Sequence, residues 1–401
     1  MSSDNEGKMQ HGLSLQKSIT NILQDFLSQK YIQSFETDYY IGKPGYQNER
    51  QFYAAFLVEI NSEEKWAIYS TTSMKDRFKG QLWDAYNLKA IDSSISKAIL
   101  VYPDGLPQDK ERDFLRRKND IINKIGYYPN TIDDILSQSE FVNLLENHTL
   151  QDTSDGSKRG ILGNKFEDRV ARLLSYADNL QKWQTNDRNI EGLHYDVFKK
   201  IVNCFELPKN DTLNIEASSE KKIIGKLPSG GNPKTDVLVT VSFKDHTEKT
   251  YTISCKRSSA DKVSIHDYTA DKFASVLDPS NTELKDLLND FQNAGGPKRL
   301  GEEKCDRLTS VIKPYIEKLS KWALGGHGGD GNPNTQWADY IMVYNAETNK
   351  TSIHRIEKYI ELLTKSDNNG TFGTPFGWTY PSKQLGKRIQ LKGKIINEEE
   401  E

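Results

Sequence analysis

A polar segment, His148–Lys158, is rich in Thr, Asp, Ser and Gly and interrupts the apolar periodicity of the chain. Segments of this composition connect domains and do not enter a core. The chain has 401 residues, which is enough for two or three domains. We therefore expect an N-terminal domain at 13–147, a linker at 148–159 and a second domain at 160–397.

The apolar spacing in the first domain predicts an α/β fold. The expected strands are 52–60, 66–72 and 95–102, and the expected helices are 13–27, 81–88, 110–125 and 131–145. The polar residues 1–12 are expected to be a disordered N-terminus, and 398–401 an acidic tail with no role.

The second domain has the same mixed character, with strand-like alternation between stretches of helical spacing. The expected helices are 162–176, 195–205, 284–291 and 305–322, and the expected strands are 235–243, 250–255, 340–344 and 351–356. This order predicts a mixed sheet flanked by helices.

Composition excludes some functions and leaves others open. The longest apolar runs are too short to span a membrane, and the first twelve residues lack the apolar core of a signal peptide. None of the three cysteines forms a C-x-x-C pair, so a cytoplasmic protein with reduced thiols is expected. The net charge of −3 means that any DNA-binding surface must be locally basic.

Basic residues gather in three places. Residues 368–397 contain no acidic residue, and shorter clusters lie at Lys75–Lys79 and Arg116–Lys118. A solvated surface is the alternative for each cluster.

One predicted hairpin carries an arrangement suited to phosphodiester hydrolysis. Asp236 opens the strand 235–243, and Lys256 follows the strand 250–255, so the two side chains are expected at the same end of the sheet. Glu167, in the predicted helix upstream, offers a further carboxylate. By itself the pattern is also compatible with an ordinary salt bridge.

The residue types at this hairpin fit a metal-assisted reaction. The Asp236 carboxylate and the backbone carbonyl of Cys255 are oxygen ligands, which Mg²⁺ prefers. Lys256 is expected to orient or deprotonate the attacking water, with a pKa that falls near a divalent cation. Ser254 stands where such sites usually have Asp or Glu, which predicts weaker metal binding.

Several blocks in order along the chain resemble the MspI family of type II restriction endonucleases, within the PD-(D/E)xK nucleases. These blocks are Gly231–Asp236, Ser254–Ser259, Lys262–Ile265, Leu308–Trp322, Phe372–Gly373, Trp378–Tyr380 and Gln390–Lys394. The resemblance covers roughly residues 160–394, and the N-terminal domain lies outside it.

The resemblance implies a PD-(D/E)xK fold, a Mg²⁺ cofactor and cleavage of double-stranded DNA at a short palindrome, CCGG or a related GC-rich site, with 5′-phosphate ends. It implies that Asp236, Ser254 and Lys256 form the catalytic set, since the family tolerates an uncharged asparagine at the position of Ser254. The residues that it implies contact DNA are Lys262, Ser264, Thr379, Tyr380, Lys383, Lys387, Arg388, Gln390 and Lys392.

Some alternatives stay open at this point. The chain is predicted to be a restriction enzyme; a DNA-binding protein with a decayed nuclease site, or a structure-specific repair nuclease, would share much of the pattern. The N-terminal domain is predicted to be a DNA-binding or specificity module, a dimerisation or structural module, or a second active site. A cognate DNA methyltransferase is expected in the same system without a stable complex, and the oligomeric state is open.

Overall fold

The computed structural model describes residues 3–29, 31–42, 51–74, 78–123, 130–149, 155–187, 190, 192–348, 350–366 and 370–396. The chain divides into two compact units. The first contains residues 1–154 and 176–198, and the second contains residues 155–175 and 199–401. Residues 176–198 were predicted to lie in the second domain; their contacts place them with the first unit, because their apolar and polar partners are there.

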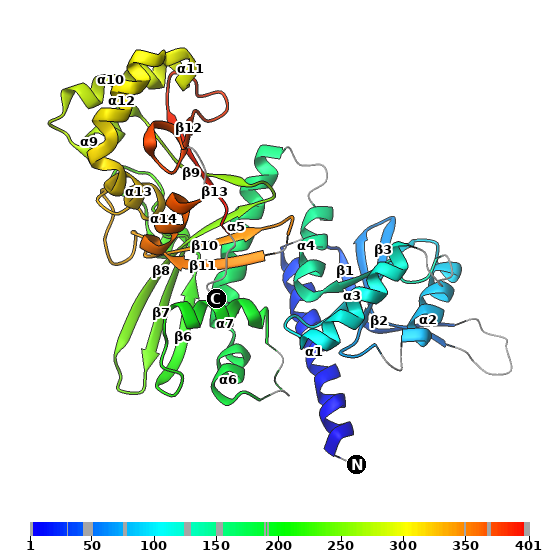
Figure 1. Ribbon diagram of the computed structural model, residues 1–401. Coiled ribbons are helices and arrows are strands. Elements are labelled where there is room, and N and C mark those ends of the chain that lie inside the picture. Colours follow the sequence, from blue (N-terminus) through cyan, green and yellow to red (C-terminus); the bar gives the residue numbers. More distant parts are fainter. Residues whose placement is uncertain are drawn as a thin grey trace. The chain divides into compact units, whose positions relative to one another are not determined.

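The first unit contains a five-stranded sheet in the order β1-β2-β3-β4-β5 (Figure 1). The strands are β1 (Ser34–Gly42), β2 (Gln51–Asn61), β3 (Glu64–Ser70), β4 (Ile95–Tyr102) and β5 (Asp134–Ser137). The helices are α1 (Ser3–Ser28), α2 (Phe78–Ile91), α3 (Gln108–Ile122), α4 (Gln138–Thr149) and α6 (Ala177–Thr185). The pairs β1–β2 and β2–β3 are antiparallel, and β3–β4 and β4–β5 are parallel.

Side-chain alternation along these strands creates a core on each face of the sheet. On β3, Trp66 and Ile68 pack with residues of α1 and α4, whereas Ala67 and Tyr69 pack with residues of α2 and α3. Both faces are therefore covered by helices, as a nearly continuous apolar strand such as β4 requires.

The second unit contains a mixed five-stranded sheet, β11-β10-β8-β7-β6, and a three-stranded antiparallel sheet, β12-β13-β9. Its strands are β6 (Thr212–Ser218), β7 (Val237–Phe243), β8 (Glu248–Ser258), β9 (Lys262–Tyr268), β10 (Tyr340–Asn345), β11 (Lys350–Arg355), β12 (Gly377–Thr379) and β13 (Ile389–Lys394). The strands β8 and β10 are parallel, and the other neighbours in the larger sheet are antiparallel.

Helices flank these sheets (Figure 1). They are α5 (Asp155–Ser175), α8 (Lys221–Ile224), α9 (Ala270–Leu277), α10 (Thr282–Ala294), α11 (Pro297–Leu300), α12 (Glu302–Ile312), α13 (Ile316–Gly325) and α14 (Ile356–Lys365), with 3-10 turns at Lys313–Tyr315 and Thr371–Gly373. The helix α7 (Tyr195–Cys204) begins in the first unit and ends in the second. Helix α5 packs on β6, β7 and β8, and helices α9, α10 and α12 share a core with the three-stranded sheet.

The predicted α/β class is confirmed, and some predicted elements were wrong. Residues 305–322 form two helices with a 3-10 turn between them, because Pro314 lacks the N–H that a continuous helix needs. The predicted helix 131–145 is the strand β5 followed by α4. Helix α1 begins at Ser3, within the segment expected to be disordered. Residues 1–2, 150–154 and 397–401, where parts of the terminal and linker predictions fall, lie outside the described residues.

No helix in the described part of the chain is long and apolar enough to cross a membrane.

Candidate active site

Asp236 lies immediately before β7, and its backbone N–H donates to the carbonyl of Ile253 on β8 at 2.9 Å. The antiparallel register pairs Val237 with Ile253, so the residues that follow Ile253 continue past the start of β7. Ser254, Cys255 and Lys256 are therefore next to Asp236. The predicted placement of Asp236 and Lys256 at one end of the hairpin is what the structure shows.

Three donors converge on one oxygen of Asp236. Its Oδ2 accepts hydrogen bonds from the backbone N–H of Cys255 at 2.7 Å, from Nζ of Lys256 at 3.1 Å and from Oγ of Ser254 at 3.3 Å. Nζ of Lys256 also donates to the carbonyl oxygen of Cys255 at 2.9 Å. Ser254 supplies no charge, and its hydroxyl donates to the Asp236 carboxylate and helps to orient it.

Lys256 is held in its charged form. Burial by itself favours the neutral amine, but the Asp236 carboxylate outweighs this effect and raises the pKa of Lys256 above its usual value. The lowered pKa of Lys256 that the sequence predicted refers to the site with a divalent cation bound. In the metal-free protein, Lys256 is a fixed positive charge beside Asp236.

Glu167 lies on α5 and lines the same cleft as Asp236. Burial and the negative charge of Asp236 raise the pKa of Glu167 to about 8, and the positive charges of Lys256 and Lys221 only partly oppose this effect. A carboxylate whose charge is disfavoured by a second carboxylate in the same cleft is typical of a cation-binding or acid–base site.

The cleft has a volume of about 180 Å³. Besides the two carboxylates, Lys221 and Lys226 line it, together with Ser219 and Asn164. Sequence reasoning missed these four residues, because they come from α5 and from the segment after β6 and form no local motif. Lysines beside a carboxylate pair are suited to contact a phosphate group that enters the cleft.

The donor set fits a hard divalent cation. Asp236, Glu167 and the Cys255 carbonyl are oxygen donors, which Mg²⁺ and Ca²⁺ prefer. Burial and the charges of Asp236 and Glu167 raise the pKa of the Cys255 thiol well above its usual value, so its carbonyl is the ligand to consider. Within the described ranges, no group of three His, Cys, Asp or Glu side chains is arranged as a metal site. A cation here would keep several water ligands.

Four of the predicted DNA-contacting residues meet on the sheet β12-β13-β9, which we call the recognition sheet. On one side of β13, Lys392 pairs with Ser264 of β9. On the other side of β13, Gln390 pairs with Thr379 of β12. Nε2 of Gln390 donates to Oγ of Ser264 at 3.0 Å. The neighbours Ile265, Trp378 and Leu391 point into the core, so these four polar residues share the outer face.

The other predicted contacts are more dispersed. Lys262 begins β9, and Lys383 and Lys387 are exposed in the connection between β12 and β13. Arg388 pairs with Asp267 at 2.8 Å, so part of its charge is already neutralised. Tyr380 lies beside Gly295, the C-cap residue of α10, which favours a packing role for its ring.

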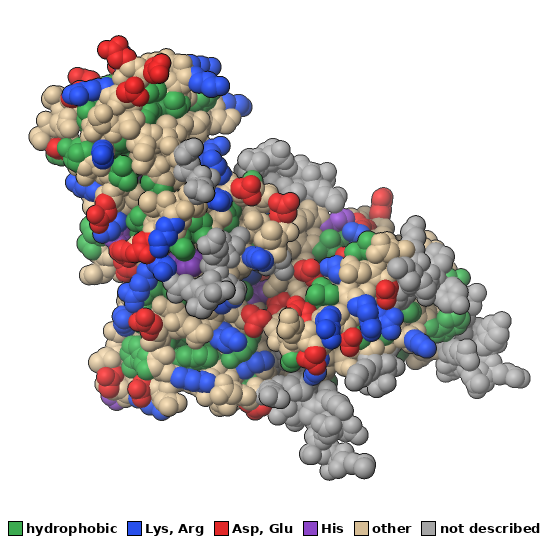
Figure 2. Space-filling model, viewed as in Figure 1, with side chains coloured by type: hydrophobic (Ala, Val, Ile, Leu, Met, Phe, Trp, Pro, Cys, Tyr) green, Lys and Arg blue, Asp and Glu red, His purple; other side chains and the backbone are tan. Residues whose placement is uncertain are grey.

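The basic cluster Arg116–Lys118 on α3 is neutralised by nearby acids. Arg116 pairs with Asp113, Arg117 with Asp120, and Lys118 with Asp134 and Glu140. Figure 2 shows Lys and Arg side chains intermixed with Asp and Glu over this part of the first unit. This cluster therefore gives no support to a DNA-binding role. Lys75 and Arg77, from another cluster, lie outside the described residues.

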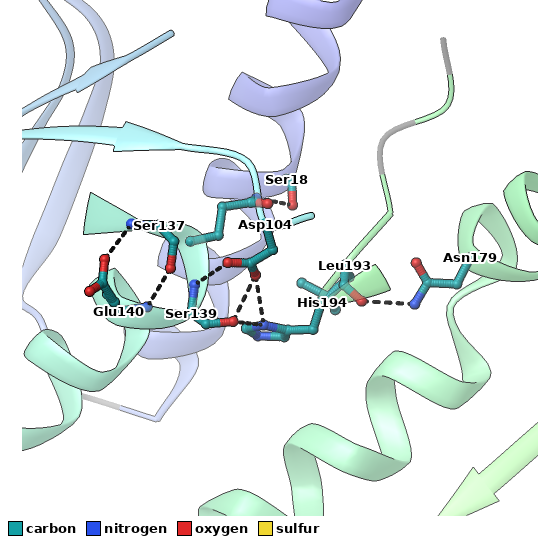
Figure 3. Close-up of polar contacts among 9 residues, drawn as sticks. Ser18, Asp104, Ser137, Ser139, Glu140, Asn179, Leu193 and His194 are labelled. Atoms are coloured by element: carbon teal, nitrogen blue, oxygen red, sulfur yellow. Dashed lines mark hydrogen bonds and ion pairs between the residues drawn. The ribbon is translucent and has the colours of Figure 1, made fainter. Parts of the chain in front are cut away.

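A second, partly buried polar cluster lies in the first unit, where Asp104, Ser139 and His194 meet (Figure 3). Oγ of Ser139 is 2.7 Å from Oδ2 of Asp104 and 2.9 Å from Nδ1 of His194, and Asp104 is 3.4 Å from the same nitrogen. In a serine-nucleophile triad, the carboxylate and the hydroxyl bind opposite ring nitrogens. Here both lie at Nδ1, so the cluster is a structural connection between residues 176–198 and the rest of the unit.

The Asp104 cluster predicts a pH-dependent contribution to stability. Burial alone would raise the pKa of Asp104, but hydrogen bonds and charge from His194, with hydrogen bonds from Ser139, hold it below its usual value. The stabilisation is therefore present above about pH 4 and is lost as pH falls through the folded-state pKa. We expect Asp104→Asn to cost about 1–3 kcal/mol at pH 7.

Urea denaturation at pH 7 and at pH 3.5 measures this effect. The difference between wild type and Asp104→Asn should shrink at the lower pH, whereas the exposed Asp109→Asn should match wild type at both. An equal difference at the two pH values would contradict the assigned role of Asp104.

Comparison with known proteins places the chain in a family. The family model described as restriction endonuclease MspI matches residues 143–393, more than half of the chain. The chain belongs to the MspI restriction endonuclease family. It is accordingly an enzyme of the type II restriction class, whose members generally use a divalent metal. The family match begins within α4, earlier than the predicted start at residue 160.

Two relatives of the MspI family extend the comparison. Type II restriction enzyme BsuFI of Bacillus subtilis is 29% identical over 407 aligned residues, which cover 98% of this chain and 99% of BsuFI. Type II restriction enzyme MspI of a Moraxella species is 26% identical over 250 residues, covering 61% of this chain and 94% of MspI. The first unit therefore has a counterpart sequence in BsuFI.

The fold of the MspI family is supported by a solved structure. The crystal structure of MspI in complex with its cognate DNA matches with a TM-score of 0.52 at 24% identity, over 61% of this chain and 93% of that chain.

Proposed function

We propose that this protein cuts double-stranded DNA in a Mg²⁺-dependent reaction at a short palindromic, GC-rich site, CCGG or a related sequence, and leaves 5′-phosphate ends. The observation that carries the proposal is the convergence of Ser254 and Lys256 on Asp236, with Glu167 in the same cleft. The family supports DNA as substrate, since MspI was solved with its cognate DNA. We also propose that the protein is located in the cytoplasm and that a cognate DNA methyltransferase belongs to the same system.

Glu167 and the residues around Asp236 would have distinct roles in this reaction. Asp236, Glu167 and the Cys255 carbonyl would hold the cation, which when bound would withdraw negative charge from the scissile phosphate. Lys256, which is charged, would orient the attacking water and stabilise the negative charge that develops on the phosphate. Ser254 keeps the Asp236 carboxylate in place through its hydrogen bond.

The recognition sheet would read the DNA sequence. Amide and ammonium groups such as those of Gln390 and Lys392 can bond base edges in the major groove, and Ser264 and Thr379 add hydroxyls. The exposed Lys383 and Lys387 of the β12–β13 connection would contact phosphates, as would Lys262, and so set the register of the protein on the duplex. Tyr380 and Arg388 would contact DNA only at the edge of this surface.

Incubation of the purified protein with a plasmid of known sequence and Mg²⁺ tests the proposed function. Discrete fragments whose ends map to one palindrome are expected. Sequence-specific binding in a gel shift, with no cutting in Mg²⁺ or Mn²⁺, would show a decayed nuclease instead. Cutting at junctions or mismatches regardless of sequence would show a repair nuclease.

Lys392 and Lys387 form a matched pair for the recognition surface. Because a base contact carries sequence information, Lys392→Ala should weaken binding to the cognate site by about 1–3 kcal/mol and relax specificity at one base pair. Lys387→Ala should weaken cognate and unrelated DNA alike and lower the slope of log K against log salt by about one. Salt titrations on cognate and altered duplexes measure both effects. Identical behaviour of the two variants would contradict the division of roles.

A further inference from the structure

Lys234 is a lysine inside the second unit to which the proposed cleavage chemistry assigns no role. It lies two residues before Asp236, and its side chain is only partly exposed. Nζ of Lys234 donates to the backbone carbonyl of Ile265 on β9 at 2.6 Å. This distance is shorter than the usual range of about 2.7–3.2 Å between donor and acceptor in N–H···O hydrogen bonds of proteins. The hydrogen bond joins the start of the catalytic strand to a strand of the recognition sheet.

The carbonyl that Lys234 holds is next to a candidate DNA-reading residue. Ile265 directly follows Ser264, whose Oγ accepts the hydrogen bond from Gln390. The Ile265 side chain is buried against Gly393 of β13, where an added Cβ would come within 2.9 Å of it. The backbone around Ile265 is therefore held by the recognition sheet through its side chain and by Lys234 through its carbonyl.

The backbone and the aliphatic stem of Lys234 are also held in place by contacts. Its backbone N–H donates to the carbonyl of Gln336 at 3.2 Å, and the Gln336 amide in turn donates to the carbonyls of Ile224 and Lys226, which line the cleft. The stem of Lys234 packs against Gly326, where an added Cβ would lie 3.1 Å from Cγ of Lys234. Gly326 has a φ of +80°, a conformation that glycine adopts without strain.

We propose that Lys234 is a positioning residue that couples the recognition sheet to the cleavage centre. The path runs from Gln390 through Ser264 and the carbonyl of Ile265 to Lys234, and from there along two peptide bonds to Asp236. A base pair that seats the recognition sheet correctly would also set the position of the Asp236 carboxylate. A wrong base pair that displaces β9 would displace Asp236 with it. This inference rests on the proposed function and adds to it the means by which reading the DNA controls cutting.

Lys234→Met tests the coupling, because methionine keeps the apolar stem and removes the donor. The substrates are duplex oligonucleotides with the mapped site or with one base pair of it changed. We expect the single-turnover cleavage rate at the correct site to fall about 10- to 100-fold, since small misplacements of reacting groups have effects of this size. We expect Kd to change less than about threefold. The cleavage rate at the correct site divided by that at the changed site should be about tenfold smaller in Lys234→Met than in wild type.

A purely structural role would not change that ratio. Lys318→Met is the matched control, because Nζ of Lys318 also donates to a backbone carbonyl, that of Leu277, at 3.0 Å. It should match wild type in rate, Kd and rate ratio. The coupling is overturned if Lys234→Met cuts like wild type, or if its rates at both sites fall by the same factor.

Two further outcomes separate the coupling from folding and from the proposed function. The melting temperature of each variant is measured first, and if Lys234→Met does not fold, Lys234→Gln is used with the same expectations. Loss of folding in both variants would make Lys234 a structural residue and overturn the coupling. If wild type itself cuts neither duplex, the proposed function fails, which is a different result from an unchanged rate ratio.

Discussion

Lys256→Ala is expected to lower the rate of DNA cleavage by at least about 10³-fold and to leave most of the DNA binding intact. The reason is positional: Nζ of Lys256 lies 3.1 Å from Asp236 and 2.9 Å from the Cys255 carbonyl, at the point where the scissile phosphate would bind. One charge of this kind acts mainly on the transition state, whereas binding energy is spread over many phosphate and base contacts. Single-turnover cleavage and a gel shift on one duplex measure the two quantities.

Lys249→Ala is the control for this prediction. Lys249 lies on the same strand, β8, but at its other end, where it is exposed and contacts the ring of Tyr251. It should cut at the wild-type rate. Cleavage retained by Lys256→Ala would remove Lys256 from the catalytic set, and equal losses of binding and cutting would make it a binding residue.

The second large effect is expected from Glu167→Gln, which should stabilise the metal-free protein while abolishing cutting. Because the pKa of Glu167 is raised to about 8, its contribution to stability is full below the unfolded-state value near 4.5 and is lost as pH rises through about 8. Glutamine at this position stays neutral, so the variant does not lose stability as pH rises. The expected gain at pH 8 is on the order of a few kcal/mol, since one pKa unit corresponds to about 1.4 kcal/mol.

Denaturation of the metal-free protein between pH 5 and pH 8 measures this gain. Wild type should lose stability across the range relative to Glu167→Gln, and the exposed Glu303→Gln should follow wild type. A divalent cation should stabilise wild type more than Glu167→Gln, because the variant lacks one carboxylate ligand. Equal pH dependence in all three proteins would show that Glu167 does not carry a raised pKa, and equal stabilisation by the cation would show that it is not a ligand.

The sequence predicted those parts of the site that depend on local pattern. Two strands joined by a short polar turn place Asp236 and Lys256 side by side whatever the rest of the fold does, and the register confirms it. Glu167 was noted as a further carboxylate in a predicted helix, and in the structure it lines the cleft together with Asp236.

The contacts that sequence reasoning missed depend on tertiary packing. Lys221 and Lys226 reach the cleft because the segment after β6 turns toward α5, and no periodicity reports such a turn. The partner of Lys234 is a backbone carbonyl 31 residues away, which no side-chain motif can indicate. Strands β9 and β13 were missed because each has few apolar residues among polar ones, and β13 also contains a glycine.

The division of the chain also constrains how such an enzyme can be altered. Because residues 176–198 return to the first unit, the chain passes between the units at three points, near 154, 175 and 198. A truncation that keeps only residues after 154 would still carry Trp183 and Phe198, apolar side chains that belong to the discarded unit. Recombination at a single breakpoint cannot exchange the first unit for another module. An exchange of the first unit would need breakpoints at all three points, so that residues 176–198 are replaced together with residues 1–154.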